Sequence, residues 1–420
     1  MGLNKNNQPK LLKVEVPEKN VKLRLTLVIL LVALGVGMIA YAIHALVTKE
    51  PGWYTVELTE GHTELNDELI FNYCIGSGEL SAADEYRKVS SLYAAEVSRA
   101  YRLFDVFRSY EDVVNLYTIN RYPGETWEVD PVLYEAFALM EEMESRILYM
   151  GPVFSEYRNL FSSQSEAQAS LCDPHTDEET RLYLETVMAF AADPAAIRVE
   201  LLGDNRITFH ISDAYRSFLH ENGVTDALDF GWLTNAFIVD HVAEVMISHG
   251  YTAGNITSYD GYTRNFDDSG ESYGFNIFDR VENNVYPAAV AQYRGRISMV
   301  FLRDYPLGKR DMAVYYAYPD GRYATRYADT VTGVYQSALH NLVSYAYDKS
   351  CAEVAVRMAE AFIAEELDEG KLDAMSQKQV YSIWCVDGIV RYNEEAMILS
   401  DLYRDETVSY ESAYRAPSGQ

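Results

Sequence analysis

An apolar run near the N-terminus, residues 25–47, is the feature that most restricts how this chain can fold. The residues that interrupt it are Thr26, Gly35, Gly37, Tyr41 and His44. A helix of roughly 20 apolar residues crosses the hydrocarbon core of a bilayer, which is about 30 Å thick. We therefore expect a transmembrane anchor over residues 23–47. The run stays apolar past residues 40–42, which resemble a signal-peptidase site, so we expect the anchor to remain uncleaved.

Charge is distributed very differently on the two sides of this run. Of the 35 basic and 63 acidic residues, residues 1–49 contain seven basic and two acidic ones. Residues 50–420 therefore contain 28 basic and 61 acidic ones, a net charge of −33. Because basic flanks stay on the cytoplasmic side, we expect a cytoplasmic basic tail over 1–22 and an extracytoplasmic domain over 50–400. So acidic a domain disfavours nucleic acid as a partner, since it would repel the phosphate backbone.

Four cysteines lie in the predicted extracytoplasmic domain: Cys74, Cys172, Cys351 and Cys385. An even number permits two disulfides, with three possible connectivities. None of the cysteines has C-x-x-C spacing, which argues against a zinc site or a thioredoxin-like motif. We expect at least two of them to be buried as small apolar residues.

The clearest local pattern covers residues 228–264 and predicts a strand, a turn and a helix. Asp229 is flanked by apolar residues in the alternation of a short strand, and Gly231 permits a tight turn. Apolar residues at helical spacing follow, and Gly250 supplies the expected stop. A helix that starts after a glycine turn offers unpaired backbone N–H groups, which suit a phosphate or pyrophosphate. An ordinary strand-to-helix connection would have the same pattern.

The rest of the predicted domain alternates helices with hairpins. The expected helices cover residues 82–107, a segment that begins at Asp130–Pro131, residues 176–191 and residues 352–367. Thr176 and Glu179 have capping-box spacing at the start of the third helix. The expected hairpins join residues 197–200 to 207–209, and 380–384 to 388–392. We expect residues 401–420 to form a flexible tail.

The 228–264 stretch resembles the central motif of the FAD:protein FMN transferase (ApbE) family, a pattern of roughly LDxGGxxKGxxxD. The matching residues are Leu228, Asp229, Gly231 and Asp240. The substituted positions are Trp232 for the second Gly, Asn235 for the Lys, Ala236 for the next Gly, and residues 258–261 for the glycine-pair turn that follows the helix.

Two later segments extend the resemblance, which spans roughly residues 69–392. Residues 321–333 resemble the family's dGkxyHIIDPxTG: Asp329, Thr332 and Gly333 match, Arg326 stands for the His and Thr330 for the Pro. Residues 350–357 resemble ADxxxT: Ala352 matches, Glu353 replaces the Asp and Arg357 replaces the Thr.

The resemblance implies an α+β, ApbE/T-fold-like domain of antiparallel sheets packed with helices, behind one transmembrane helix in a bacterial cell membrane. It implies FAD as ligand and Mg²⁺ as the ion that neutralises its pyrophosphate. The implied catalytic residues are Asp329 and Thr332. The implied cofactor-binding residues are Asp229, Gly231, Asn235, Asp240, Gly261, Arg326, Gly333 and Arg357. The implied metal ligands are Ala352 and Glu353.

The substitutions change the chemistry that the family motifs would supply. Arg357 cannot ligate Mg²⁺, and a guanidinium 4 Å from a unit charge would repel it by about 4 kcal/mol at an effective dielectric constant of 20. Asn235 lacks the charge of the family's Lys. Arg326 and Arg357 could instead contact phosphate oxygens directly, or lie in surface ion pairs.

Three functions follow as expectations. The first is a catalytically degenerate, membrane-anchored family member that binds flavin or acts as a scaffold for a partner. The second is an active Mg²⁺-dependent FAD:protein FMN transferase that attaches FMN to a Thr or Ser of a membrane or extracytoplasmic partner. The third is an interaction module without a ligand, because 34 tyrosines would suit a contact surface.

Overall fold

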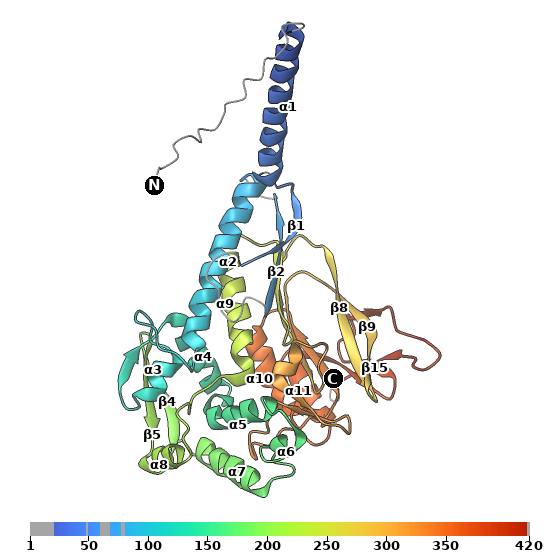
Figure 1. Cartoon of the computed structure of the whole chain (residues 1–420). Helices are drawn as coiled ribbons and strands as arrows, with labels where there is room; N and C mark the ends of the chain where they lie inside the picture. Colours follow the sequence, from blue (N-terminus) through green and yellow to red (C-terminus); the bar gives the residue numbers. More distant parts are fainter. Residues whose placement is uncertain (1–20, 48, 59–67, 77–79, 418–420) are drawn as a thin grey trace, which may run out of the picture.

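The computed structural model describes residues 21–47, 49–58, 68–76 and 80–417, and Figure 1 shows helix α1 (Val21–Val47) standing clear of an α+β body. Apolar side chains on α1, including Leu27 and Leu31, are exposed. No helix within the described ranges is both long enough and apolar enough to span a bilayer. The anchor over 23–47 stays a prediction, and residues 1–20 of the expected cytoplasmic tail lie outside the described residues.

The body is built on a large sheet. In the described part of the chain nine strands form it, in the order β1 (Gly52–Val56), β2 (Leu69–Ile75), β6 (Gly254–Ser258), β7 (Tyr262–Asn265), β10 (Ile297–Arg303), β13 (Asn341–Ala346), β14 (Tyr381–Val386), β15 (Ile389–Tyr392) and β17 (Glu411–Tyr414). Neighbouring strands are antiparallel, except that β15 and β17 are parallel. The expected α+β class with antiparallel sheets is confirmed.

Both faces of this sheet are covered, which makes its central strands apolar on both sides. Val300 and Leu302 of β10 belong to the core beneath the helices, whereas Met299 and Phe301 belong to a second core on the other face. The second core is closed by a three-stranded sheet of β8 (Ser272–Val281), β9 (Asn284–Arg294) and β16 (Ile398–Ser400). β10 is therefore a continuous apolar run instead of an alternating one.

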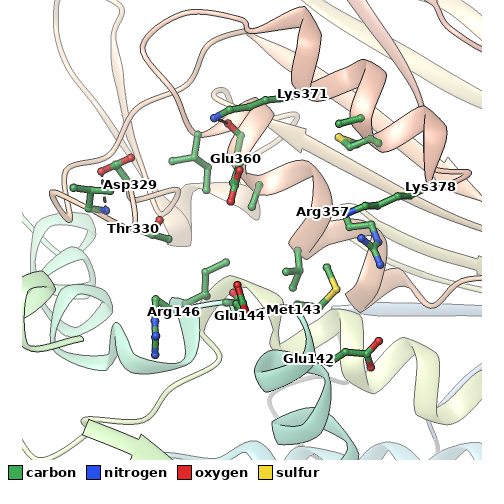
Figure 2. Close-up of a pocket in the computed structure, with 18 residues that line it drawn as sticks. Glu142, Met143, Glu144, Arg146, Asp329, Thr330, Arg357, Glu360, Lys371 and Lys378 are labelled. Carbon is green, nitrogen blue, oxygen red and sulfur yellow. Dashed lines mark hydrogen bonds between the residues drawn. The ribbon is translucent and has the colours of Figure 1, made fainter. Parts of the chain in front are cut away.

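The helices pack on one face of the large sheet, with α9 (Thr234–Ser248) at the centre. It contacts α2 (Ala82–Phe104) on one side and α10 (Cys351–Phe362) on the other. Beyond α10 lies α11 (Glu369–Gln377), and loop 142–147 faces this helix pair across a pocket (Figure 2).

A smaller lobe completes the body. Its sheet consists of β3 (Thr126–Glu128), β5 (Arg206–Ile211) and β4 (Ile197–Gly203), and its helices are α3 (Leu116–Arg121), α4 (Pro131–Glu142), α5 (Gly151–Phe161), α6 (Glu166–Ala169), α7 (Glu178–Ala192) and α8 (Asp213–Glu221). Short elements connect the lobes: η2 (Ile147–Tyr149), η3 (Gly231–Leu233), η4 (Asp311–Val314), β11 (Tyr315–Ala317) and β12 (Tyr323–Thr325).

Three expectations differ from the structure. Residues 228–230 do not form a strand, because both backbone groups of Leu228 bond to the side chain of Asn120, at 2.8 and 2.9 Å. The cap of α7 is Asp177 instead of Thr176. The prediction of a flexible tail over residues 401–420 is wrong as far as residue 417. In this segment β17 pairs with β15, and Arg415 binds Glu369 at 2.9 Å.

The four cysteines are free thiols in the structure. Cys351 and Cys385 are buried, whereas Cys74 and Cys172 are partly exposed. The expectation that at least two are buried as small apolar residues is therefore confirmed.

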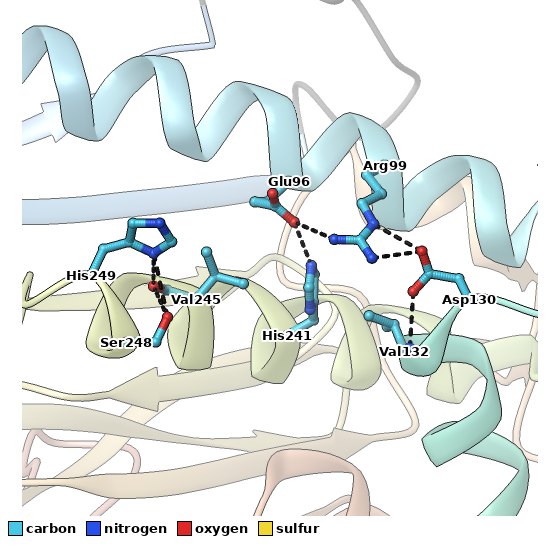
Figure 3. A network of polar contacts seen from close by, with 8 residues as sticks. All are labelled: Glu96, Arg99, Asp130, Val132, His241, Val245, Ser248 and His249. Atoms are coloured by element: carbon cyan, nitrogen blue, oxygen red, sulfur yellow. Dashed lines mark hydrogen bonds and ion pairs between the residues drawn. The ribbon is translucent and has the colours of Figure 1, made fainter. Parts of the chain in front are cut away.

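A polar network shown in Figure 3 ties α2, α9 and α4 together. His241 on α9 lies 2.8 Å from Glu96 on α2, measured between Nε2 and Oε2. Arg99 bridges this pair to Asp130, with 2.6 Å between its Nη2 atom and Oδ2 of the carboxylate. The other oxygen of Asp130 caps α4 by accepting the Val132 N–H at 3.0 Å. Asp130 therefore acts both as a helix cap and as an ion-pair partner.

We expect Asp130→Ala to lower the free energy of unfolding by about 1–2 kcal/mol, because it removes a helix cap together with an ion pair. Asp130→Asn is the matched control, since an amide oxygen can still accept the Val132 N–H. The free energy of unfolding of Asp130→Asn should fall by less than about 1 kcal/mol, which is the usual contribution of an exposed ion pair. Urea unfolding measures both variants, and equal losses would show that the cap contributes nothing.

Candidate functional site

A pocket of about 330 Å³ opens beside the start of α9, and we call it the α9 pocket. Its walls come from the end of α2, from α5, from η3 and from η4. The aromatic side chains that line it are Tyr101, Phe104, Phe107, Phe154, Tyr157, Phe161 and Trp232. Flat aromatic walls of this kind favour a planar apolar ligand.

Polar side chains that bind one another form the other part of this pocket. Asn235 Nδ2 donates hydrogen bonds to Glu68 Oε2 and to Asp260 Oδ2, both at 3.0 Å. Arg326 donates to the same oxygen of Asp260 at 3.1 Å. Burial raises the pKa of Glu68, and the nearby Asp260 charge adds to this, while the Asn235 hydrogen bond works against it. Two buried atoms of this group, Asp260 Oδ1 and Arg326 Nε, have no hydrogen-bond partner among the described residues.

Asp229 lies at the rim of the α9 pocket in a second cluster. Arg158 binds its carboxylate at 3.0 Å and also binds Asp226 at 2.9 Å. Burial raises the pKa of Asp229, although the Arg158 charge opposes the shift. Asp229 also accepts the Gly231 N–H at 2.7 Å. This N–H, which we expected to face a phosphate, is therefore already occupied.

Gly231 itself is required by the turn. Its φ of +55° lies in the left-handed region, and a Cβ atom there would lie 2.3 Å from the Phe154 ring. The glycine thus allows an aromatic wall of the pocket to approach the backbone closely.

The remaining implied cofactor-binding residues lie elsewhere. Asp240 accepts the backbone N–H groups of Cys351 at 2.8 Å and Ala352 at 2.9 Å, and so caps α10. Gly261 packs against β10, where an added Cβ would lie 2.3 Å from the Phe301 carbonyl oxygen. Neither Asp240 nor Gly261 is among the described residues that line the α9 pocket.

Asp329, Thr332 and Gly333 form a self-contained turn. Asp329 Oδ1 accepts the Thr332 N–H at 2.7 Å and the Thr332 hydroxyl at 3.0 Å. The Gly333 carbonyl accepts the Tyr157 hydroxyl at 2.6 Å, which fixes the turn behind an aromatic wall of the α9 pocket. Asp329 lines the pocket of Figure 2 instead, together with Arg357.

The residues implied as metal ligands do not fit Mg²⁺. Glu353 binds Lys349 at 3.1 Å and Arg357 at 2.7 Å, so two cations neutralise its carboxylate. Burial acts to raise the pKa of Glu353, but its hydrogen bonds to Arg357 and Lys349 hold the pKa below its usual value. In the described ranges, no group of three or more His, Cys, Asp and Glu side chains is placed to hold a metal ion.

The structure thus brings Asp229, Gly231, Asn235 and Arg326 to one pocket, and leaves Asp240, Gly261, Gly333, Ala352 and Glu353 outside it. Sequence analysis did not identify Glu68, and no local pattern around it marks a site. The pairing of Arg158 was not predicted either, because the two carboxylates that it binds lie 71 and 68 positions away in sequence.

Comparison with known proteins supports the fold. No protein-family model and no curated protein matches the chain. The structure is similar to the ApbE protein of Thermotoga maritima, with a TM-score of 0.53 and 15% identity, covering 84% of this chain and 100% of that one. It is also similar to the flavin transferase ApbE of Vibrio cholerae, with a TM-score of 0.50 and 13% identity, covering 84% and 98%. These likenesses show an ApbE-like fold.

We expect Gly231→Ala to destabilise the protein through both backbone strain and a clash with Phe154. Gly223→Ala is a matched control, because Gly223 has a φ of +67° with open space around its Cβ position. The clash should make the loss at Gly231 larger by about 1–3 kcal/mol, the usual effect of overpacking. Thermal or urea unfolding measures the difference, and similar losses at both sites would contradict the close approach of Phe154.

The Asp240 cap generates a pH prediction. Burial raises the pKa of Asp240 to about 6 from a model-peptide value of 3.8, although the N–H groups of Ala352 and Cys351 oppose the shift. A raised pKa means that the stabilising contribution is complete below the unfolded pKa and is lost as the pH rises through 6. Relative to Asp240→Asn, the free energy of unfolding of the wild type should therefore fall by about 1 kcal/mol between about pH 5 and pH 7.5.

Urea unfolding at both pH values tests this, with Glu244→Gln as the control. Glu244 is an acid on the same helix, 61% exposed and paired with Arg264, so its removal should leave the pH dependence close to that of the wild type. A wild type that instead gains stability over this range, relative to Asp240→Asn, would show that the two N–H donors outweigh burial.

Proposed function

We propose that this chain is a flavin-transferase-like protein that holds a flavin ring in the α9 pocket and has lost the transfer chemistry. The observation that carries the proposal is the polar network of Asn235, Glu68, Asp260 and Arg326 at one end of this pocket. Two of these residues stand where the family resemblance places a Lys and a His. Here they bind neighbouring carboxylates within the protein.

The α9 pocket is suited to a ring system. Aromatic side chains such as Phe107 and Trp232 can stack on a planar heterocycle, while Asn235 and Glu68 offer polar atoms for its edge. Its volume of about 330 Å³ lies at the lower end of the range for small-ligand pockets. This size suits a flavin ring better than a whole dinucleotide. A bound flavin would supply redox chemistry through its ring.

The groups that transfer chemistry needs are missing from the same region. Phosphoryl transfer depends mainly on positioning and on neutralising charge. Arg326 cannot act as a base, because a guanidinium stays protonated in proteins. Asn235 carries no charge, and the Glu353 carboxylate is paired with Lys349 and Arg357. We therefore derive no step through Mg²⁺.

The full chain, purified in a mild detergent and titrated with riboflavin, FMN and FAD, tests the proposal. We expect the fluorescence of each of the three flavins to be quenched when it binds the protein. We expect no AMP release from FAD, with or without Mg²⁺. Phe107→Ala should weaken binding by about 3- to 10-fold, the usual contribution of an aromatic contact. Phe107 is 59% exposed, so its truncation should leave the fold intact.

Tyr122→Ala is the matched control, because Tyr122 is 53% exposed and does not line the α9 pocket. AMP release that appears only with Mg²⁺ would instead establish an active transferase. Absence of binding by all three flavins would leave a protein that has kept the fold as an interaction module.

A further inference from the structure

One wall of the α9 pocket is a short strap, residues 306–314, which connects the end of β10 to the start of β11. Pro306 and Gly308 interrupt regular structure near its beginning, and η4 forms its last turn. Ala313 and Val314 line the pocket, and η4 packs against α5, which forms another wall. The strap therefore closes the pocket along the side next to α5.

The two ends of the strap are fixed, whereas its middle is not packed into the core. Tyr305 and Tyr315 flank it and are buried, and the Tyr315 hydroxyl donates to the Arg303 carbonyl at 2.9 Å. Among the described residues of the strap, none from 307 to 313 is buried. The backbone hydrogen bonds within residues 308–313 are 3.2–3.3 Å long. Segments with few buried contacts and exposed hydrogen bonds open locally at a low cost in free energy.

An ion pair holds the middle of the strap against the body. Asp311 Oδ2 accepts Arg303 Nη2 at 2.8 Å and the Leu307 N–H at 2.7 Å. Arg303 is buried at the end of β10, and the Asp311 side chain is 9% exposed. Arg303 Nη2 also donates to the Tyr259 carbonyl at 3.0 Å. The same guanidinium thus holds both the strap and the turn that carries Asp260.

The burial of Arg303 decides how this contact behaves. A buried guanidinium that loses its carboxylate is strongly destabilised, so the closed strap is the dominant state. A second contact lies at the surface, where the exposed Arg310 guanidinium stacks 4.0 Å from the centroid of the Tyr259 ring. Because exposed contacts contribute less than buried ones, the Arg303–Asp311 pair mainly determines how often the strap opens.

We propose that the strap 306–314 is a gate of the α9 pocket and that the Arg303–Asp311 ion pair is its latch. When the latch is closed, Ala313 and Val314 complete the wall beside α5. When it opens, the strap moves on its two fixed ends and admits solvent and ligands to the pocket. The gate acts on the site for which we propose a flavin, but its motion is measurable without any ligand, so either proposal can fail without the other.

Limited digestion of the full chain with trypsin tests the latch, because the strap contains the exposed Lys309–Arg310 bond. A protease cleaves a folded protein where a segment opens locally, so the rate follows the open population. Arg303→Met should be cleaved at this bond about tenfold faster than the wild type, because the latch is lost. Arg303→Lys should be cleaved more slowly than Arg303→Met, since an ammonium group can still pair with Asp311. Mass spectrometry identifies the cleaved bond.

Arg415→Met is the matched control for this digestion. Arg415 is also a partly buried arginine that pairs with two carboxylates, and it does not line the α9 pocket. Its loss should leave cleavage of the strap unchanged. If Arg303→Met fails to fold, Asp311→Asn should still raise the rate of cleavage about threefold, because an uncharged amide accepts hydrogen bonds more weakly than a carboxylate.

Acrylamide quenching of Trp232 fluorescence tests whether the moving strap opens the pocket. Trp232 lines the pocket and is 2% exposed. The background Trp53→Phe/Trp127→Phe removes the two tryptophans that are not buried, and Trp384 is fully buried. In this background Arg303→Met should raise the quenching constant about threefold, because the open state gives the quencher access. Equal cleavage in the wild type and the latch variants, equal acceleration in the control variant, or an unchanged quenching constant would each overturn the gate.

Discussion

The carboxylate of Asp240 is the contact on which the central helix pair depends. Asp240 projects from α9, and its carboxylate accepts two backbone N–H groups at the start of α10. Without it these N–H groups would lie unsatisfied at a partly buried helix end. The bond joins segments 111 residues apart in sequence. Because α9 starts beside one pocket and α10 borders the other, this carboxylate sets the relative position of both pockets.

Around this fixed pair, the protein uses its charged residues mostly to bind one another. Arg326, Arg158 and Arg357 each form an ion pair with a carboxylate of the protein. Many tyrosines serve the core in the same way: Tyr73 and Tyr345 are buried with their hydroxyls on glutamates. The abundance of tyrosine therefore reflects packing, which weakens the argument for a ligand-free contact surface.

Sequence patterns predicted the helices well because their signals are local. The apolar stripe of α9 and the Asp130–Pro131 start of α4 depend on residues within a few turns. Asp229, Gly231, Asn235 and Arg326 line one pocket, as the motifs led us to expect, and their role in binding stays a prediction. The positions of Glu68 and Arg158 could not be predicted, because each binds residues more than 60 positions away. Residues 228–230 were mistaken for a strand because an asparagine side chain satisfies the backbone there.

The order of strands in the large sheet carries a consequence for how the chain folds. β2 lies beside β6, and the Asn72–Asn255 side-chain bond between them spans 183 positions. β1 forms one edge and β17 the other, so the two ends of the domain close opposite sides of the same sheet. Such high contact order favours slow folding, because distant segments must meet before their contacts stabilise anything. The edge of β2 that pairs with β6 stays unpaired until more than half of the chain has been synthesised, although its other edge can already pair with β1.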